Sequence, residues 1–146
     1  MTSKNVSVLK KERITMEPRL NIDKKISKIA EELKNREPIF HHPEYGTKRE
    51  DFERMTEETF WEVGASGNRY SREFILDTLE KRFNNPPKEE FEIKDFHCLE
   101  ISENNFLVTY TLIQEKVRIT RRTTIWKKSA EEWKIVYHQG TIVEQK

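Results

Sequence analysis

A chain of 146 residues is long enough for one domain with a single buried core. Charged residues make up 36% of the chain and hydrophobic residues only 34%, so the core must be thin and the outer surfaces heavily solvated. The formal net charge of +1 divides into +3 for residues 1–20 and −2 for the remainder, which gives no general reason to expect nucleic-acid binding.

Cysteine content and hydropathy bear on the cellular compartment. A single cysteine, Cys98, excludes an internal disulfide and suggests a reducing environment. No apolar run approaches the length of a membrane span, and the N-terminus lacks the hydrophobic region of a signal peptide. We therefore expect a soluble, cytoplasmic protein without a membrane partner.

Residues 1–20 show no helical or strand periodicity, which predicts a flexible basic arm followed by one domain over residues 21–146. The alternative, a polybasic tether for a membrane or RNA, is disfavoured because the basic residues are few and interrupted by acids. The next segment is helical. Asn21 is a fair N-cap, Pro38 should end the helix near residue 36 or 37, and the apolar stripe consists of Ile22, Ile26, Ile29, Ala30 and Leu33.

Two further helices are predicted from their capping residues. Thr47, with Glu50 completing a capping box, should begin a short helix over residues 48–55. Ser71 should cap a helix over residues 72–82 whose buried stripe is Phe74, Ile75, Leu79 and Phe83. The run Asn84-Asn85-Pro86-Pro87 would stop this helix.

The remaining segments have the period-two pattern of strands. One begins at Phe60 and runs into a glycine-rich turn, and the others are predicted over residues 91–101, 105–115, 117–128 and 132–143. Three helices with a run of four long strands predict an α+β fold with helices packed on one face of an antiparallel sheet.

The last strand, residues 132–143, is expected to lie centrally in a curved antiparallel sheet. Strict alternation would place Trp133, Ile135, Tyr137 and Gln139 on one face and Lys134, Val136 and His138 on the other.

Two stretches carry a resemblance to a known superfamily: Phe60-Trp61-Glu62-Val63-Gly64-Ala65-Ser66-Gly67 leading into Tyr70-Ser71-Arg72-Glu73, and Trp133-Lys134-Ile135-Val136-Tyr137-His138-Gln139-Gly140-Thr141. The residues of these two stretches and their order along the chain resemble the nuclear-transport-factor-2-like superfamily. Within it they resemble the SnoaL-like branch, which includes a widespread bacterial domain of unknown function. The resemblance covers about residues 24–143.

This resemblance implies a cone-shaped, cystatin-like fold, with three N-terminal helices packed on a curved antiparallel sheet and a pocket at the open end of the cone. It also implies a homodimer formed through the outer face of the sheet. Enzymes of the superfamily, such as ketosteroid isomerase and polyketide cyclases, carry an acidic general base on the first strand. The ketosteroid isomerase aspartate would align with Val63 here, so the sequence departs from that pattern, and the nearest carboxylate is Glu62.

Glu62 shares a strand face with Phe60, so a carboxylate should enter the interior if the phenyl ring does. A buried carboxylate must be paired or protonated, and the possible partners are Arg121, Arg69 and His138. The carboxylate is either an acidic or ligand-orienting group of the pocket, or part of a structural ion pair.

His138 and Tyr110 are the other polar candidates. A neutral imidazole facing a carboxylate could act as acid or base near pH 7, whereas a buried histidine is more often a satisfied core residue. Tyr110 lies in an apolar strand and is mostly expected to pack. The full set of predicted ligand-binding residues is Phe60, Trp61, Glu62, Tyr110, Arg121, Trp126, Tyr137, His138 and Gln139, with Glu62 and His138 as catalytic candidates.

Three motifs are better explained structurally. The stretch Gly64-Ala65-Ser66-Gly67 lacks the Walker lysine and the dinucleotide spacing, which indicates a turn and no nucleotide. The pair His41-His42 with Glu44 is an unfavourable metal site because adjacent residues on a turn rarely face one ion, so we expect no metal and no cofactor. The basic strand over residues 117–128 predicts a charged outer sheet face with cross-strand acids, not an RNA-binding platform; the possible acids are Glu92, Asp95, Glu100 and Glu115.

The sequence is most consistent with a domain that binds a small organic ligand. One alternative is a lyase, isomerase or hydrolase of a small molecule that uses Glu62 and His138 as acid and base. A second alternative is a protein-interaction module that acts through the face of its sheet.

Overall fold

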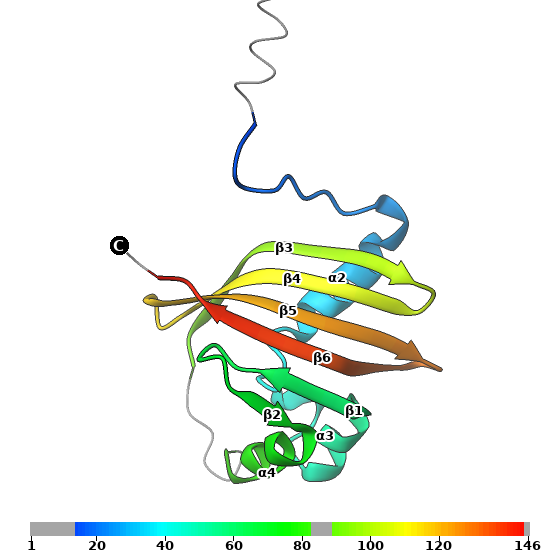
Figure 1. Cartoon of the computed structure of the whole chain (residues 1–146). Coiled ribbons are helices and arrows are strands. Elements are labelled where there is room, and N and C mark those ends of the chain that lie inside the picture. The colour runs from blue at the N-terminus through cyan, green and yellow to red at the C-terminus, as the bar shows by residue number, and fades with distance from the viewer. Residues whose placement is uncertain (1–13, 83–88, 145–146) are drawn as a thin grey trace, which may run out of the picture.

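The computed structural model describes residues 14–82 and 89–144. Most of the predicted arm, the side chain of Phe83 and the predicted helix stop at residues 84–87 therefore lie outside the described residues. The described elements follow one another as shown in Figure 1: η1 Lys24–Ile26, α2 Ser27–Arg36, η2 Pro43–Tyr45, α3 Arg49–Met55, β1 Thr56–Val63, β2 Arg69–Ser71, α4 Arg72–Arg82, β3 Phe91–Ser102, β4 Asn105–Gln114, β5 Arg118–Ser129 and β6 Glu132–Ile142.

Helix α2 ends and helix α3 begins close to the predicted residues. The predicted cap at Asn21 was wrong, because Asp23 caps the 3-10 turn Lys24–Ile26 and α2 begins only at Ser27. Helix α2 ends at Arg36, because Glu37 precedes a proline and is extended. Helix α3 begins at Arg49, and its cap differs from the expected one. The carboxylate of Asp51, not that of Glu50, accepts hydrogen bonds of 3.1 Å from the backbone N–H groups of residues 47 and 48.

Helix α4 has the predicted bounds, and the Ser71 hydroxyl oxygen accepts a hydrogen bond of 3.1 Å from the backbone N–H of Phe74. The predicted buried stripe was wrong at Phe74, whose side chain is 53% exposed and stacks on Tyr70. Leu76 is buried instead, together with Leu79.

The six strands form one sheet in the order β2-β1-β6-β5-β4-β3. Strand β6 is interior, as expected, but the sheet is mixed and not antiparallel throughout, because β1 pairs with β6 in parallel. The expectation of three N-terminal helices was also wrong. From residue 14 onward, two α-helices precede the sheet. Helix α4 follows β2 and leads toward β3, so it belongs to the connection between the two edge strands.

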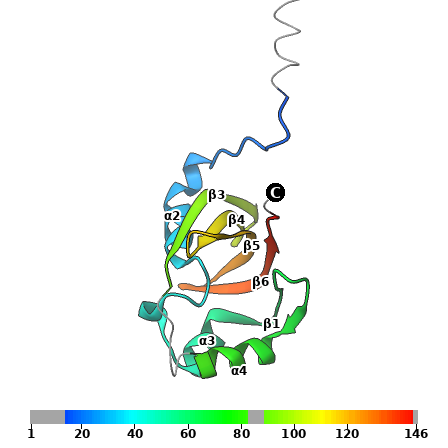
Figure 2. The same cartoon turned by 90° about the vertical axis from the view of Figure 1, so that its left-hand side faces the viewer.

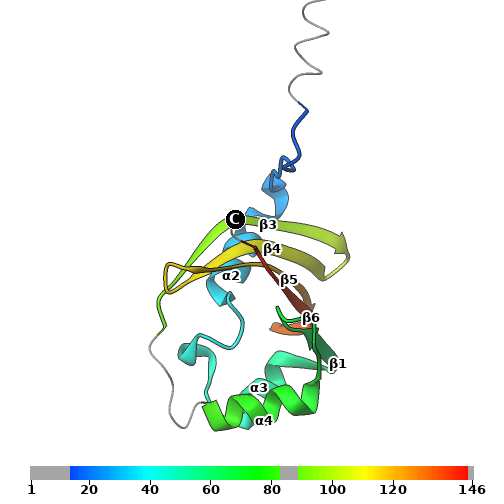
Figure 3. The ribbon, with the colours of Figure 1, turned by 60° about the vertical axis from the view of Figure 1, so that its left-hand side comes forward.

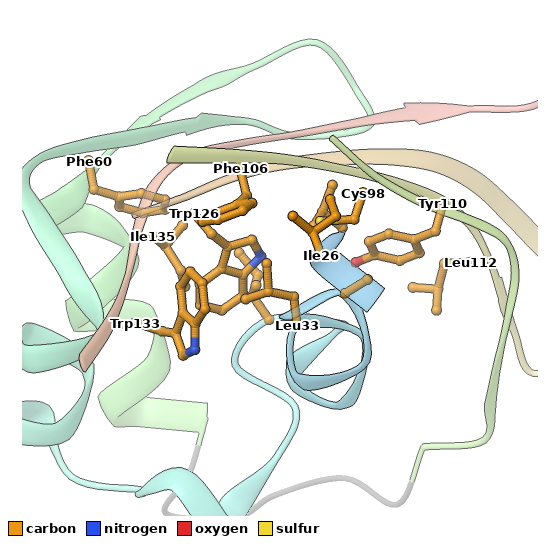
Figure 4. Packing of buried hydrophobic residues seen from close by; sticks show 13 residues of the cluster. Ile26, Leu33, Phe60, Cys98, Phe106, Tyr110, Leu112, Trp126, Trp133 and Ile135 are labelled. Atoms are coloured by element: carbon orange, nitrogen blue, oxygen red, sulfur yellow. The ribbon is translucent and has the colours of Figure 1, made fainter. Parts of the chain in front are cut away.

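The face of the sheet that carries Val108, Tyr110 and Leu112 is here called the inner face, and the opposite one the outer face. Figures 2 and 3 show that the sheet is strongly bent, that α2 lies against its inner face, and that α3 and α4 lie on the side of β1. Figure 4 shows the core between them, where the Trp126 and Trp133 rings approach Leu33 of α2.

A β-bulge at Val136 changes which residues of β6 face inward. Residues 125 and 126 of β5 are consecutive, but their partners on β6 are residues 137 and 135, so Val136 is the extra residue. Trp133 and Ile135 are buried on the inner face, and after the bulge His138 is buried there. The predicted common face of residues 133, 135, 137 and 139 was therefore wrong, because an extra residue reverses the alternation.

Candidate functional site

A cavity of about 300 Å³, here called the inner cavity, opens between the inner face of the sheet and helix α4. Its polar side chains come from strands β1, β4, β5 and β6, from helix α4 and from residues 41 and 89, and its other walls are apolar. Its lining consists of Ile39, Phe40, His41, Glu62, Ile75, Thr78, Leu79, Arg82, Glu89, Gln114, Arg122 and His138. This volume is at the lower end of the range for small-molecule sites.

Glu62 and His138 both line this cavity, as the sequence suggested they would. They are direct register partners in the parallel pair of β1 and β6, so their side chains project side by side from neighbouring strands. The bulge at Val136 is what brings the imidazole to this face.

The imidazole of His138 is buried, and its two nitrogens differ. Nδ1 lies 2.8 Å from the Thr124 hydroxyl, whereas Nε2 is buried without a hydrogen-bond partner among the described residues. Burial, together with the positive charge of Arg122, lowers the pKa of His138 to about 3. The imidazole is therefore neutral near pH 7.

The tautomer of His138 is linked, through the Thr124 hydroxyl, to the buried carboxyl of Glu37. The Thr124 hydroxyl hydrogen-bonds the Glu37 carboxyl and lowers its pKa, the direction expected of a donated hydrogen bond, although burial raises that pKa overall. A hydroxyl has one proton to donate, so when Thr124 donates to the ionised Glu37 carboxylate, its oxygen accepts from Nδ1–H of His138. Nε2 then carries the lone pair, which makes it a hydrogen-bond acceptor and a potential base.

Glu37 itself is fully buried at the end of α2 and was missed by sequence reasoning. Its carboxyl oxygens accept hydrogen bonds from the Tyr110 hydroxyl at 2.6 Å and from Trp126 Nε1 at 2.9 Å. These bonds lie behind the cavity wall, so the two aromatic residues support the site and do not line the inner cavity.

Glu62 has a perturbed acidity. Burial raises the pKa of its carboxyl from 4.5 to about 7, against the opposing effect of the positive charge of Arg122. At neutral pH the carboxyl is divided between its protonated and ionised forms. A group with this pKa can donate or accept a proton.

Arg122, on the inner face of β5, brings a positive charge to the cavity lining. Its Nε donates to the Thr120 hydroxyl at 3.0 Å, and Nη2 lies 3.4 Å from the side-chain oxygen of Gln114. Within the described residues no carboxylate lies within 4.0 Å of its guanidinium. The two side chains that accept its hydrogen bonds, Thr120 and Gln114, are neutral.

A charged group stands at the edge of the inner cavity. His41 Nδ1 contacts the Glu89 carboxylate, and Arg82 Nη2 lies 2.9 Å from His41 Nδ1 and 3.4 Å from Glu89. Burial and the charge of Arg82 lower the pKa of His41 to about 4.

Four of the predicted ligand-binding residues lie on the outer face, away from the inner cavity. The Trp61 and Tyr137 rings make an edge contact at 4.9 Å, and the Tyr137 hydroxyl donates to the Gln139 side-chain oxygen at 2.6 Å. Arg121 pairs with Asp95 at 3.5 Å and donates to the Thr111 hydroxyl. The remaining one, Phe60, is buried in the core.

Of the three possible partners of Glu62, His138 lies beside it, whereas the arginine that acts on its carboxyl is Arg122 and not Arg121 or Arg69. Period-two alternation places the adjacent residues 121 and 122 on opposite faces of β5. The pairing of Arg121 with Asp95 agrees with the predicted charged outer face.

The other motifs have structural roles. The backbone N–H of Gly64 donates to the carbonyl of Asn68 at 2.9 Å, which closes the hairpin of β1 and β2, and Gly67 has the positive φ expected of a turn glycine. Neighbouring residues 41 and 42 have different carboxylate partners, since His42 pairs with Glu44 at 3.5 Å.

Residues 14–82 and 89–144 show neither a metal cluster nor a membrane-spanning helix. They contain no group of three or more His, Cys, Asp or Glu side chains placed to hold a metal ion. None of the helices in these ranges is long and apolar enough to cross a membrane.

No protein-family description matches the sequence, and no curated protein is significantly similar to it. Solved structures do match. A candidate dehydratase of the nuclear-transport-factor-2-like family from Streptomyces avermitilis has a TM-score of 0.62 at 14% identity, covering 81% of this chain and 98% of its own.

A candidate ketosteroid isomerase from Parabacteroides distasonis has a TM-score of 0.61 at 16% identity, covering 84% of this chain and 94% of its own. An uncharacterised protein with a cystatin-like fold from Caulobacter vibrioides has a TM-score of 0.53 at 18% identity, covering 66% of this chain and 76% of its own. The chain therefore has the nuclear-transport-factor-2-like, cystatin-like fold.

Proposed function

We propose that this chain is a domain that binds a small organic molecule in the inner cavity. The observation that carries the proposal is Nε2 of His138, which is buried beside the Glu62 carboxyl and has no hydrogen-bond partner in residues 14–82 and 89–144. A buried acceptor without a partner costs about 1–3 kcal/mol, and a ligand that donates a hydrogen bond to it would recover that energy. The apolar residues Ile39, Phe40, Ile75 and Leu79 would hold the body of the ligand.

The second candidate function is acid–base catalysis on such a molecule, as a lyase, isomerase or hydrolase. Glu62, with a pKa of about 7, would exchange a proton with the substrate, and His138 would accept a second one. The fold shared with a candidate isomerase and a candidate dehydratase supports this alternative as an analogy of fold.

We also propose a homodimer formed through the outer face. Large apolar side chains are exposed there or at its margin, namely Trp61 at 43%, Leu99 at 48% and Ile101 at 49%. The same face would serve the alternative of a protein-interaction module. The narrower SnoaL-like assignment and the cytoplasmic location stay predictions from the sequence.

A fragment screen by ligand-observed NMR tests the binding proposal. Fragments that bind the wild-type protein should lose at least tenfold in affinity in the His138→Leu variant, because the variant removes the buried acceptor. The Gln139→Leu variant is the matched control, since it changes the adjacent residue on the outer face. Equal losses in both variants, or in neither, would argue against the inner cavity as the binding site.

A further inference from the structure

The guanidinium of Arg122 is a half-buried cation. No carboxylate in residues 14–82 and 89–144 lies within 4.0 Å of it. The guanidinium donates hydrogen bonds to the side chains of Thr120 and Gln114, which are both neutral. An arginine has five N–H donors, so N–H groups beyond those two remain to bind a further acceptor. Because an unpaired cation in a partly buried site is unfavourable, an anion in the inner cavity would stabilise it.

Below pH 7 the other charged and titratable groups that line the inner cavity do not neutralise this cation. His138 on β6 is neutral there, and Glu62 on β1 is largely protonated below pH 7. At the edge of the cavity, Arg82 of α4 and Glu89 form an ion pair, and His41 contacts Glu89. Outside the lining, Arg118 on the same strand and the buried Glu37 also act on Arg122 electrostatically, with opposite signs. Arg122 is therefore a cation of the cavity lining without a described carboxylate within 4.0 Å.

We propose that the ligand of the inner cavity is a small organic acid, with its carboxylate bound by Arg122 and a hydroxyl group donating to Nε2 of His138. This inference rests on the proposed binding function and specifies the class of ligand. A planar guanidinium pairs well with a carboxylate through two parallel hydrogen bonds. The apolar walls, among them Phe40 and Leu79, favour an acid with an apolar body.

Binding of such an acid depends on pH through Glu62. As the pH rises through about 7, the Glu62 carboxyl ionises beside Arg122 and competes with the carboxylate of the ligand. Affinity for the acid should therefore fall above pH 7. Affinity for an uncharged ligand of the same shape should change less.

Isothermal titration calorimetry with 4-hydroxybenzoate and its neutral analogue 4-hydroxybenzamide provides the test. At pH 6 the wild-type protein should bind the acid at least tenfold more tightly than the amide. The Arg122→Gln variant should bind both with similar affinity. The Arg121→Gln variant is the control on the same strand and should behave as the wild type, because Arg121 lies on the outer face with Asp95. In the Glu62→Gln variant the affinity for the acid should no longer fall above pH 7.

The comparison of acid and amide in the wild-type protein needs no variant to fold. Equal affinity for the two compounds would overturn the inference and leave the binding function standing. Tighter binding of the acid that persists in Arg122→Gln would also overturn it, since the anion would then lie elsewhere. Binding of neither compound to the wild-type protein would overturn the inference, whereas fragments found by the screen would still support the cavity as a ligand site.

Discussion

Replacing Glu62 with glutamine should change how the stability of the protein depends on pH. The folded-state pKa of this carboxyl is raised from 4.5 to about 7, because the folded protein buries it. Below pH 4.5 the group is protonated in both the folded and the unfolded state. Between pH 4.5 and 7 only the unfolded state releases the proton, so the free energy of unfolding falls as the pH rises through this range.

The size of the effect follows from the same two pKa values. At about 1.36 kcal/mol for each pKa unit, the interval from 4.5 to about 7 corresponds to about 3 kcal/mol. This is an upper bound, because the side chain keeps some contact with solvent. A glutamine does not titrate, so the stability of wild type relative to Glu62→Gln should decrease by up to this amount between pH 4 and pH 8.

Urea denaturation of both proteins at several pH values, followed by tryptophan fluorescence, measures the difference. Taking the difference removes the contributions of the buried histidines, which are present in both proteins. The variant Glu58→Gln is a control that removes an exposed carboxyl from the same strand. A difference between wild type and Glu62→Gln that stays constant with pH would refute the assignment of a raised pKa to Glu62.

Three other predictions concern the surroundings of the site and the outer face. Tyr110→Phe removes the hydrogen bond to the buried Glu37 and should cost about 1–3 kcal/mol in unfolding free energy by urea denaturation, so an unchanged stability would contradict the buried bond. A ¹⁵N NMR titration should find His138 neutral at pH 5, because its folded pKa is about 3, and a midpoint near 6.5 would contradict its burial. Sedimentation velocity at micromolar concentration should give about twice 17.6 kDa, and Leu99→Asp should give the monomer; a monomeric wild type would refute the dimer.

The features that were predicted correctly depend on local signals. Ser71 caps α4 at the expected residue, and the proline after Glu37 ends α2 where its steric effect requires. Glu62 and Phe60 share the inner face because alternation holds over that short stretch of β1. These patterns involve residues close in sequence, so single-sequence reasoning captures them.

The errors arise where a local rule is interrupted or a long-range contact decides. After the bulge at Val136, each residue of β6 lies on the face opposite to the one that alternation predicts. No residue type in that stretch indicates a bulge. Glu37 is buried because the donors Tyr110 and Trp126 are far along the chain. The only local hint was its position before the apolar run Pro38-Ile39-Phe40.

A crystal structure of the protein soaked with the tightest fragment from the screen tests the central claim most directly. We predict electron density for the fragment in the inner cavity, with a donor atom within hydrogen-bond distance of His138 Nε2. Fragment density only on the outer face, beside Trp61 and Tyr137, with an unchanged inner cavity would contradict the assignment of the ligand site.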